Sequence, residues 1–210
     1  MSVRIAEHAG FCFGVKRATG LLEREIENCR GTGRRICTLG RIIHNDHYIA
    51  GIKAAGVEEL TRDDVPAVIE AADRGGEITV VIRAHGERRE ILEQLTECEK
   101  RNPGFRLLDG TCPYVTKVRR IAEENSGEGK IFLLSGNAAH PEVEGILSCA
   151  RGETHVFPGA EELDEWLQAS KHADSEGKNA EFCGKSISIA AQTTQNLAEW
   201  RKSINFIKIY

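Results

Sequence analysis

The sequence predicts an α/β protein made of two similar small modules, each with a largely parallel sheet. Short runs of β-branched residues alternate with amphipathic helical stretches along the whole chain, which is typical of βα units. In addition, the motifs Cys12-Phe13-Gly14-Val15 and Cys112-Pro113-Tyr114-Val115 share the pattern C-x-x-V at positions 100 residues apart. Both lie between a predicted strand and a predicted helix, which indicates an internal repeat.

The strands are predicted from β-branched runs at residues 3–6, 35–39, 78–83, 105–108, 131–134 and 186–190, with weaker candidates near Val57 and His155. Three helices are predicted from apolar residues at 3.6-residue spacing, which begin at Val15, Val115 and Leu197. These stripes are interpreted as core. Residues 170–184 are rich in Lys, Glu, Asp and Ser without an apolar period, and are predicted to form an exposed loop.

The composition is that of an ordinary globular protein: 210 residues, 40% hydrophobic and 29% charged. A net charge of −4 gives no general attraction for nucleic acid or anionic lipid, so neither is expected as a partner. The chain has no apolar run long enough for a membrane span and no signal peptide at its start, so a cytoplasmic location is expected. Seven cysteines without a C-x-x-C pair indicate reduced thiols rather than disulfides or a zinc ribbon.

Several residues that could take part in catalysis or ligand binding follow the ends of predicted strands. They are Cys12, His44, His85, Cys112, His140 with Glu142, and Thr193. Open α/β sheets bind their ligands at this position, so one shared site could collect them all. The simpler alternative is that each is a turn or helix-capping residue, because strand-to-helix turns are usually polar.

The combination of residue types narrows the chemistry. Three imidazoles together with helix N-terminal amides suit a phosphate or a diphosphate, and they equally suit a metal. Single thiols on separate loops can ligate an iron–sulfur cluster if the sulfur atoms converge in space. The other cysteines are interpreted as structural free thiols: Cys29, Cys37, Cys98, Cys149 and Cys183.

Six segments in order resemble the 4-hydroxy-3-methylbut-2-enyl diphosphate reductase family of the non-mevalonate isoprenoid pathway. They are Gly10-Phe11-Cys12-Phe13-Gly14-Val15, Leu39-Gly40-Arg41-Ile42-Ile43-His44-Asn45, Arg83-Ala84-His85-Gly86, Asp109-Gly110-Thr111-Cys112-Pro113 with the following Val115-Thr116-Lys117-Val118, Gly136-Asn137-Ala138-Ala139-His140-Pro141-Glu142-Val143-Glu144-Gly145, and Ala191-Gln192-Thr193-Thr194. Each segment is weak alone, but together they span essentially the whole chain.

The resemblance implies a trefoil of three α/β modules around a [4Fe–4S] cluster held by one cysteine per module. Cys12 and Cys112 match the first two metal ligands. Residues 13–112 correspond to the first module, with 1–12 as the N-terminal strand and cluster loop, and residues 113–210 to the second. The third cysteine and the third module are expected beyond Tyr210, so the chain is expected to be truncated relative to the family.

The family implies reductive dehydroxylation of the allylic diphosphate to isopentenyl and dimethylallyl diphosphate, with ferredoxin or flavodoxin as electron donor. By motif, Glu142 matches the catalytic proton donor, and Thr193 lies beside it near the substrate hydroxyl. His44, His85 and His140 match the diphosphate-binding residues.

Two alternatives come from other classes. The three histidines with Glu142 as base could form the site of a zinc hydrolase. The chain could also be an inactive truncated fragment that keeps diphosphate binding but holds no stable cluster.

Overall fold

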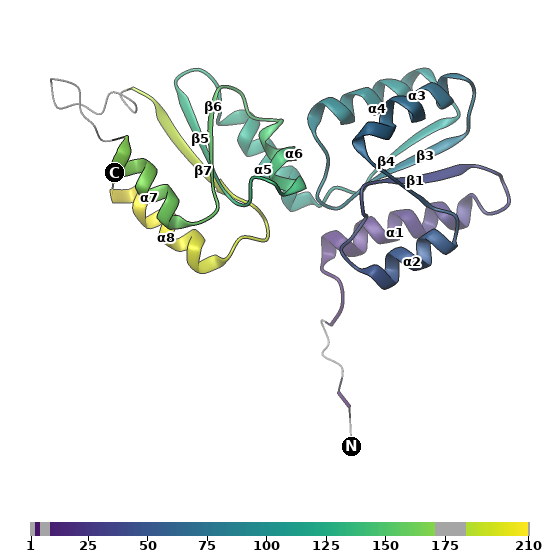
Figure 1. Cartoon of the computed structure of the whole chain (residues 1–210), viewed down its shortest axis with the longest axis horizontal. Coiled ribbons are helices and arrows are strands. Elements are labelled where there is room, and N and C mark those ends of the chain that lie inside the picture. The colour runs from purple at the N-terminus through teal and green to yellow at the C-terminus, as the bar shows by residue number, and fades with distance from the viewer. Residues whose placement is uncertain (1–2, 5–8, 171–183, 210) are drawn as a thin grey trace. The chain divides into compact units, whose positions relative to one another are not determined.

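The computed structural model describes residues 3–4, 9–170 and 184–209 of the chain. Within these residues the chain forms two compact units, Met1–Gly86 with Glu90–Pro113, and Glu87–Arg89 with Tyr114–Tyr210. Each unit contains one parallel sheet with helices on both faces (Figure 1). No helix in the described part of the chain is sufficiently long and apolar to cross a membrane.

The first unit has a four-stranded sheet in the order β2-β1-β3-β4, in which every pair of neighbours is parallel. Its elements are α1 (Phe13–Asn28), β1 (Arg35–Leu39), α2 (Asp46–Ala54), β2 (Glu58–Leu60), the short 3-10 helix η1 (Arg62–Asp64), α3 (Val65–Asp73), β3 (Ile78–Ile82), α4 (Arg89–Arg101) and β4 (Phe105–Asp109). The central strand β3 is buried at every position, as expected for a parallel strand covered on both faces.

Alternate residues of the central strands face opposite layers of this unit. Val80 and Ile82 pack with the helices α3 and α4, whereas Val81 packs with α1 and α2. The helices accordingly cover the two faces in pairs (Figure 1). The sheet therefore lies between two apolar layers.

A buried carboxylate lies between α1 and this sheet. Glu25 is only 3% exposed, and its oxygens accept hydrogen bonds from Thr79 Oγ1 at 2.6 Å, from Arg106 Nη1 at 2.9 Å and from Cys29 Sγ at 3.3 Å. Burial alone raises the pKa of Glu25, but these donors and the charge of Arg106 together lower the pKa below its usual value. The carboxylate therefore contributes to stability only in its ionised form.

The second unit has a three-stranded parallel sheet in the order β6-β5-β7. Its elements are α5 (Pro113–Glu124), β5 (Lys130–Ser135), α6 (Pro141–Leu147), β6 (Glu153–Phe157), α7 (Ala160–Ala169), β7 (Ser186–Ala191) and α8 (Leu197–Ile209). The helices α5 and α6 pack on one face around Phe132 and Leu134, and α7 and α8 pack on the other around Ile131 and Leu133.

The two units repeat one succession of elements. In both, a helix precedes the central strand, a second helix leads to an edge strand, and a third helix leads to the strand on the opposite side of the centre. The amide of Gly40 donates to Leu60 at the end of the first edge strand at 2.7 Å, and the amide of Gly136 donates to Phe157 at the equivalent place at 2.8 Å. The unit-two strand β7 is an edge strand, whereas its counterpart β3 is flanked by β4.

The predicted α/β class with two parallel-sheet modules is confirmed. Five of the six strong strand predictions match β1, β3, β4, β5 and β7, and the two weak candidates correspond to β2 and β6. The predicted strand at residues 3–6 falls partly outside the described residues, and Val3 and Arg4, which are described, belong to no strand. The predicted loop at 170–184 lies outside them over residues 171–183.

Candidate functional site

The strands of each sheet end level with one another. In the first sheet Leu39 pairs with Ile82, and Ile82 pairs with Asp109. In the second, Ser135 pairs with both Phe157 and Ala191. Loops that follow the carboxyl ends of parallel strands therefore emerge along a single edge in each unit, which is where open α/β sheets bind ligands.

The loop that carries Cys112 is fixed in the first unit by backbone hydrogen bonds. The amide of Gly110 donates to the carbonyl of Ile82 at 3.0 Å, and the amide of Cys112 donates to the carbonyl of Ala84 at 2.9 Å. A side chain at Gly110 could not fit, because its Cβ would lie 2.2 Å from the Ile82 oxygen. The Thr111 amide donates to Asp109 Oδ1 at 2.8 Å. The position of the Cys112 backbone is therefore set by the sheet.

Cys12 and Cys112 both lie at the start of α1. Cys12 is exposed and is the residue before the helix, where its side chain makes no capping hydrogen bond. Cys112 is half-buried, and its Sγ occupies the space beside Gly14, where a Cβ would lie 2.5 Å from the sulfur. The structure thus brings these two predicted metal ligands to the same helix end.

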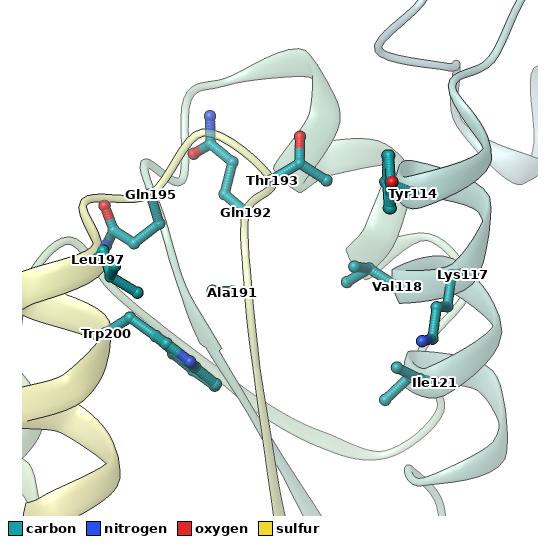
Figure 2. Close-up of a pocket in the computed structure, with 10 residues that line it drawn as sticks. All are labelled: Tyr114, Lys117, Val118, Ile121, Ala191, Gln192, Thr193, Gln195, Leu197 and Trp200. Carbon is teal, nitrogen blue, oxygen red and sulfur yellow. The ribbon is translucent and has the colours of Figure 1, made fainter. Parts of the chain in front are cut away.

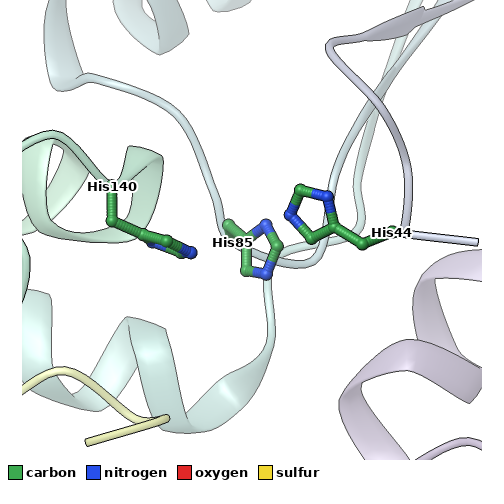
Figure 3. Close-up of side chains that lie close together, drawn as sticks. All are labelled: His44, His85 and His140. Carbon is green, nitrogen blue, oxygen red and sulfur yellow. The ribbon is translucent and has the colours of Figure 1, made fainter.

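His44 and His85 lie beside each other in the first unit. Their ring centroids are 5.2 Å apart with an interplanar angle of 32°, and Figure 3 shows the two imidazoles side by side. Both line a pocket of 250 Å³ whose other walls include Phe11, Ile42 and Ala84. The pocket therefore combines two imidazoles with an apolar wall at the carboxyl edge of the sheet.

In the second unit, Glu142 and Thr193 are directly hydrogen-bonded. The carboxylate of Glu142 is fully buried and accepts from the Thr193 amide at 2.6 Å and from the Thr193 Oγ1 at 2.9 Å. Glu142 lies in the first turn of α6, and Thr193 follows β7. Because Thr193 is exposed, its hydroxyl links a buried carboxyl group to the surface.

His140 begins the same helix. It is the N-cap of α6, and its Nδ1 accepts from the Glu142 amide at 3.1 Å. A ring nitrogen that accepts carries no proton, so we assign the proton of neutral His140 to Nε2. The predicted residues of the second unit, His140, Glu142 and Thr193, therefore form a connected group.

Thr193 also lies on the rim of a 530 Å³ pocket between α5, β7 and α8. Figure 2 shows the side chains of Val118 and Ile121 on one side of β7 and that of Trp200 on the other. Gln192 closes the upper end, where its Oε1 accepts from the Asn137 amide at 3.1 Å and its Nε2 donates to Thr194 at 2.8 Å. Gln192 thus connects the loop after β5 to the loop that carries Thr193.

Four of the remaining cysteines are internal or partly internal. Cys37 lies in β1, and burial raises the pKa of its thiol to about 11. Cys98 and Cys149 are buried, and Cys29 donates to Glu25. The surroundings of these four cysteines agree with their interpretation as structural free thiols. Cys183 lies outside the described residues.

Sequence reasoning did not assign any role to Gly14 or Arg17, which both contact the Cys112 loop. Arg17 Nη1 donates to the carbonyl of Thr111 at 3.1 Å, across 94 positions of sequence. Gly14 belongs to the first of the six family motifs, but a glycine in a helix gives no sequence signal for a contact with a distant thiol.

The chain was compared with known proteins. A family model described as "LytB protein" matches residues 3–209. Two curated relatives are named "4-hydroxy-3-methylbut-2-enyl diphosphate reductase": one from Thermoanaerobacter sp. (strain X514), 32% identical over 209 residues, and one from Aquifex aeolicus (strain VF5), 34% identical over 210 residues. Each match covers 100% of this chain and 63% of the relative, so the chain spans less than two thirds of their length.

The chain also matches solved structures. One is that of "(E)-4-Hydroxy-3-methyl-but-2-enyl Diphosphate Reductase, the Terminal Enzyme of the Non-Mevalonate Pathway", with 31% sequence identity, a TM-score of 0.70, and coverage of 99% of this chain and 64% of that one. A second, from Plasmodium falciparum, has 24% identity and a TM-score of 0.66 over 97% of this chain and 55% of that one, and supports the fold alone.

Proposed function

Since the chain belongs to the LytB protein family, we propose that it takes part in the reductive dehydroxylation of 4-hydroxy-3-methylbut-2-enyl diphosphate. The overall reaction adds two electrons and two protons to the allylic alcohol, breaks its C–O bond and releases one water. The products are isopentenyl and dimethylallyl diphosphate. The proposed activity is taken from the names of curated relatives, and these relatives are longer than this chain.

The observation that carries the proposal is the hydrogen-bonded pair of Glu142 and Thr193. The buried Glu142 accepts from the Thr193 amide through Oε1 and from the Thr193 hydroxyl through Oε2. When Oε2 is protonated this second hydrogen bond reverses, and the proton can pass to Thr193 Oγ1 as that hydroxyl gives its own proton to the leaving oxygen of the substrate. Glu142 is then the proton donor, and Thr193 delivers the proton at the surface.

The cysteines of the first unit fit an iron–sulfur cluster. Cys12 and Cys112 are thiols on two separate loops at one helix end, and Gly14 leaves the space that the Cys112 sulfur occupies. Thiolates are the usual ligands of such clusters. When bound, a [4Fe–4S] cluster would supply the electrons and a Lewis-acidic iron for the substrate oxygen. We expect ferredoxin or flavodoxin to deliver those electrons.

We assign diphosphate binding to His44 and His85 in the first unit and to His140 in the second. Imidazole N–H groups donate hydrogen bonds to phosphate oxygens, and neutral His140 can do so through Nε2 while its Nδ1 accepts from the Glu142 amide. The substrate is thus recognised without a cluster of lysines and arginines, in keeping with the negative net charge of the chain.

The proposal is tested with chain purified and reconstituted without oxygen. Iron and acid-labile sulfide are counted, and conversion of the substrate with a chemical reductant is followed by mass spectrometry of the products. Bound iron and sulfide with reductant-dependent product support the proposal. Zinc without sulfide would favour the hydrolase alternative, and calorimetric binding of the diphosphate without any turnover would favour the truncated binding fragment.

A further inference from the structure

The first turn of α1 is unusually close to the Cys112 thiol. Gly14 is the second residue of the helix and is buried. A Cβ at this position would lie 2.5 Å from Cys112 Sγ and 2.9 Å from Cys112 Cβ. Real Cβ atoms do not approach other atoms this closely, so any side chain at position 14 has to displace Cys112.

The glycine is not needed by the helix itself. Gly14 has none of the positive φ values found for glycines in the turns of this chain. In a helix alanine is preferred to glycine, because glycine loses more conformational entropy on folding. The local structure therefore favours alanine at position 14, and the distant thiol opposes it.

Arg17 contacts the same loop at the residue before the cysteine. One turn further along α1, its guanidinium donates to the carbonyl of Thr111, the residue before Cys112. The Cys112 amide is already fixed to Ala84 in the loop after β3. The thiol is thus placed by three contacts: the sheet fixes its amide, Arg17 fixes the preceding carbonyl, and Gly14 leaves room for its sulfur.

We propose that Gly14 and Arg17 are positioning residues for the Cys112 thiol, which they hold against the N-terminal turn of α1 beside Cys12. This inference rests on the proposed function, in which Cys112 is a ligand of the cluster. The contacts themselves concern the protein without iron. The positioning can therefore be tested separately from the cluster.

The first experiment measures the alkylation of Cys112 in the iron-free chain. Iodoacetamide labelling is followed by peptide mass spectrometry for Gly14→Ala, for Gly20→Ala and for the unchanged chain. Gly20 is the matched control, since it lies in the same helix and its Cβ would meet only the end of the Arg24 side chain at 3.4 Å. Displacement of the thiol from the space beside Gly14 should expose it, so we expect Gly14→Ala to speed the alkylation of Cys112 by roughly tenfold and Gly20→Ala to leave it unchanged.

A double-mutant cycle separates the thiol contact from a general effect on the helix. Gly14→Ala should lower the melting temperature when Cys112 is present. In a Cys112→Gly background, which removes both clashing atoms, the same substitution should raise it, because alanine favours the helix. A decrease of equal size in both backgrounds overturns the proposed contact.

Arg17 gives an independent arm if Gly14→Ala does not fold. Arg17→Gln should speed the alkylation of Cys112, whereas Arg24→Gln, an exposed residue of the same helix, should not. An unchanged Cys112 rate in Arg17→Gln overturns the role of Arg17.

The two proposals fail in different ways. If the unchanged chain binds no iron but Gly14→Ala and Arg17→Gln alter Cys112 alone, the positioning holds and the proposed function fails. If the unchanged chain binds iron and sulfide, and both variants bind equal amounts and alkylate at the unchanged rate, the proposed function holds and the positioning fails.

Discussion

Both carboxylate oxygens of Glu142 accept hydrogen bonds from a single residue, Thr193, at 2.6 and 2.9 Å. One donor is a backbone amide that no substitution at position 193 other than proline removes, and the other is a hydroxyl. The two can therefore be separated by mutation. This pair joins the first turn of α6 to the loop after β7, so it has a structural role as well as a chemical one.

Glu142→Gln should lower turnover at least about a hundredfold, the usual contribution of a general acid. Substrate affinity should change little, because the amide side chain still accepts from Thr193. The measurement is steady-state kinetics alongside calorimetry with the substrate. Glu161→Gln is the control, since Glu161 is an exposed acid in the first turn of α7. Near-normal turnover in Glu142→Gln would contradict the assigned role.

Thr193→Val should lower turnover by a factor similar to that of Glu142→Gln, because it keeps the backbone donor and removes the hydroxyl that delivers the proton. Thr193→Ser, which restores a hydroxyl, should recover most of the rate. A rate in the valine variant that equals that of the unchanged protein would show that Glu142 acts without Thr193.

His85→Ala should weaken the binding of inorganic diphosphate, because it removes one of the two imidazoles in the 250 Å³ pocket. Loss of one charged hydrogen bond corresponds to roughly tenfold in the dissociation constant. His47→Ala is the control, since His47 is exposed on α2 and does not line that pocket. An unchanged inhibition constant for diphosphate in His85→Ala would count against this assignment.

The stability of the chain should fall in acid through Glu25. Its pKa is lowered in the folded protein from an ordinary value of 4.5, so its contribution is complete above about pH 4.5 and is lost as the pH falls through the folded-state pKa. Thr79→Val, which removes the 2.6 Å hydrogen bond, should reduce the free energy of unfolding by about 1 to 3 kcal/mol at pH 7.

Urea unfolding at pH 7 and at pH 4 measures both effects. Glu25→Gln should flatten the difference between the two pH values. Asp46→Asn provides the comparison, because Asp46 also has a lowered pKa beside Arg41 but its side chain is 94% exposed. Solvent screens that pair, so we expect no measurable change in stability. An equal acid sensitivity in Glu25→Gln and the unchanged chain would contradict the prediction.

Iron binding should depend on Cys12 and Cys112, because thiolates are the usual ligands of an iron–sulfur cluster. Cys12→Ser and Cys112→Ser should each lower iron binding strongly. Cys29→Ser, which keeps a hydrogen-bond donor to Glu25, should not change it. Anaerobic reconstitution with iron and sulfide counts checks this, and unchanged iron binding in both serine variants would contradict it.

The sequence predicts the architecture well where burial is complete. The strand Ile78–Ile82 is apolar or β-branched at every position, and it is the central, fully buried β3. The strand β2 was predicted only weakly, because it has just three residues and two of them are exposed. Periodicity identifies strands only when one or both faces are covered.

The sequence offered candidate residues for the site but gave no sign of the contacts that they make. Polar residues after strands indicated one edge of each sheet, and the motif resemblance named Cys12, Cys112 and Glu142. Periodicity placed an apolar stripe along α1 and gave no sign that Glu25 on this helix is buried, because its partners Thr79 and Arg106 are distant in sequence. The contact between Gly14 and Cys112 could not be predicted either. The internal repeat has Tyr114 at the equivalent position, so it gives no sign that a glycine is needed there.

The free side of β7 has a consequence for how the chain behaves in solution. Among the described residues this strand pairs only with β5, so the peptide groups along its other side have no strand partner there. Such an edge is a template for further strand addition. The chain on its own should therefore self-associate as its concentration rises, and sedimentation would detect this as a growing average mass.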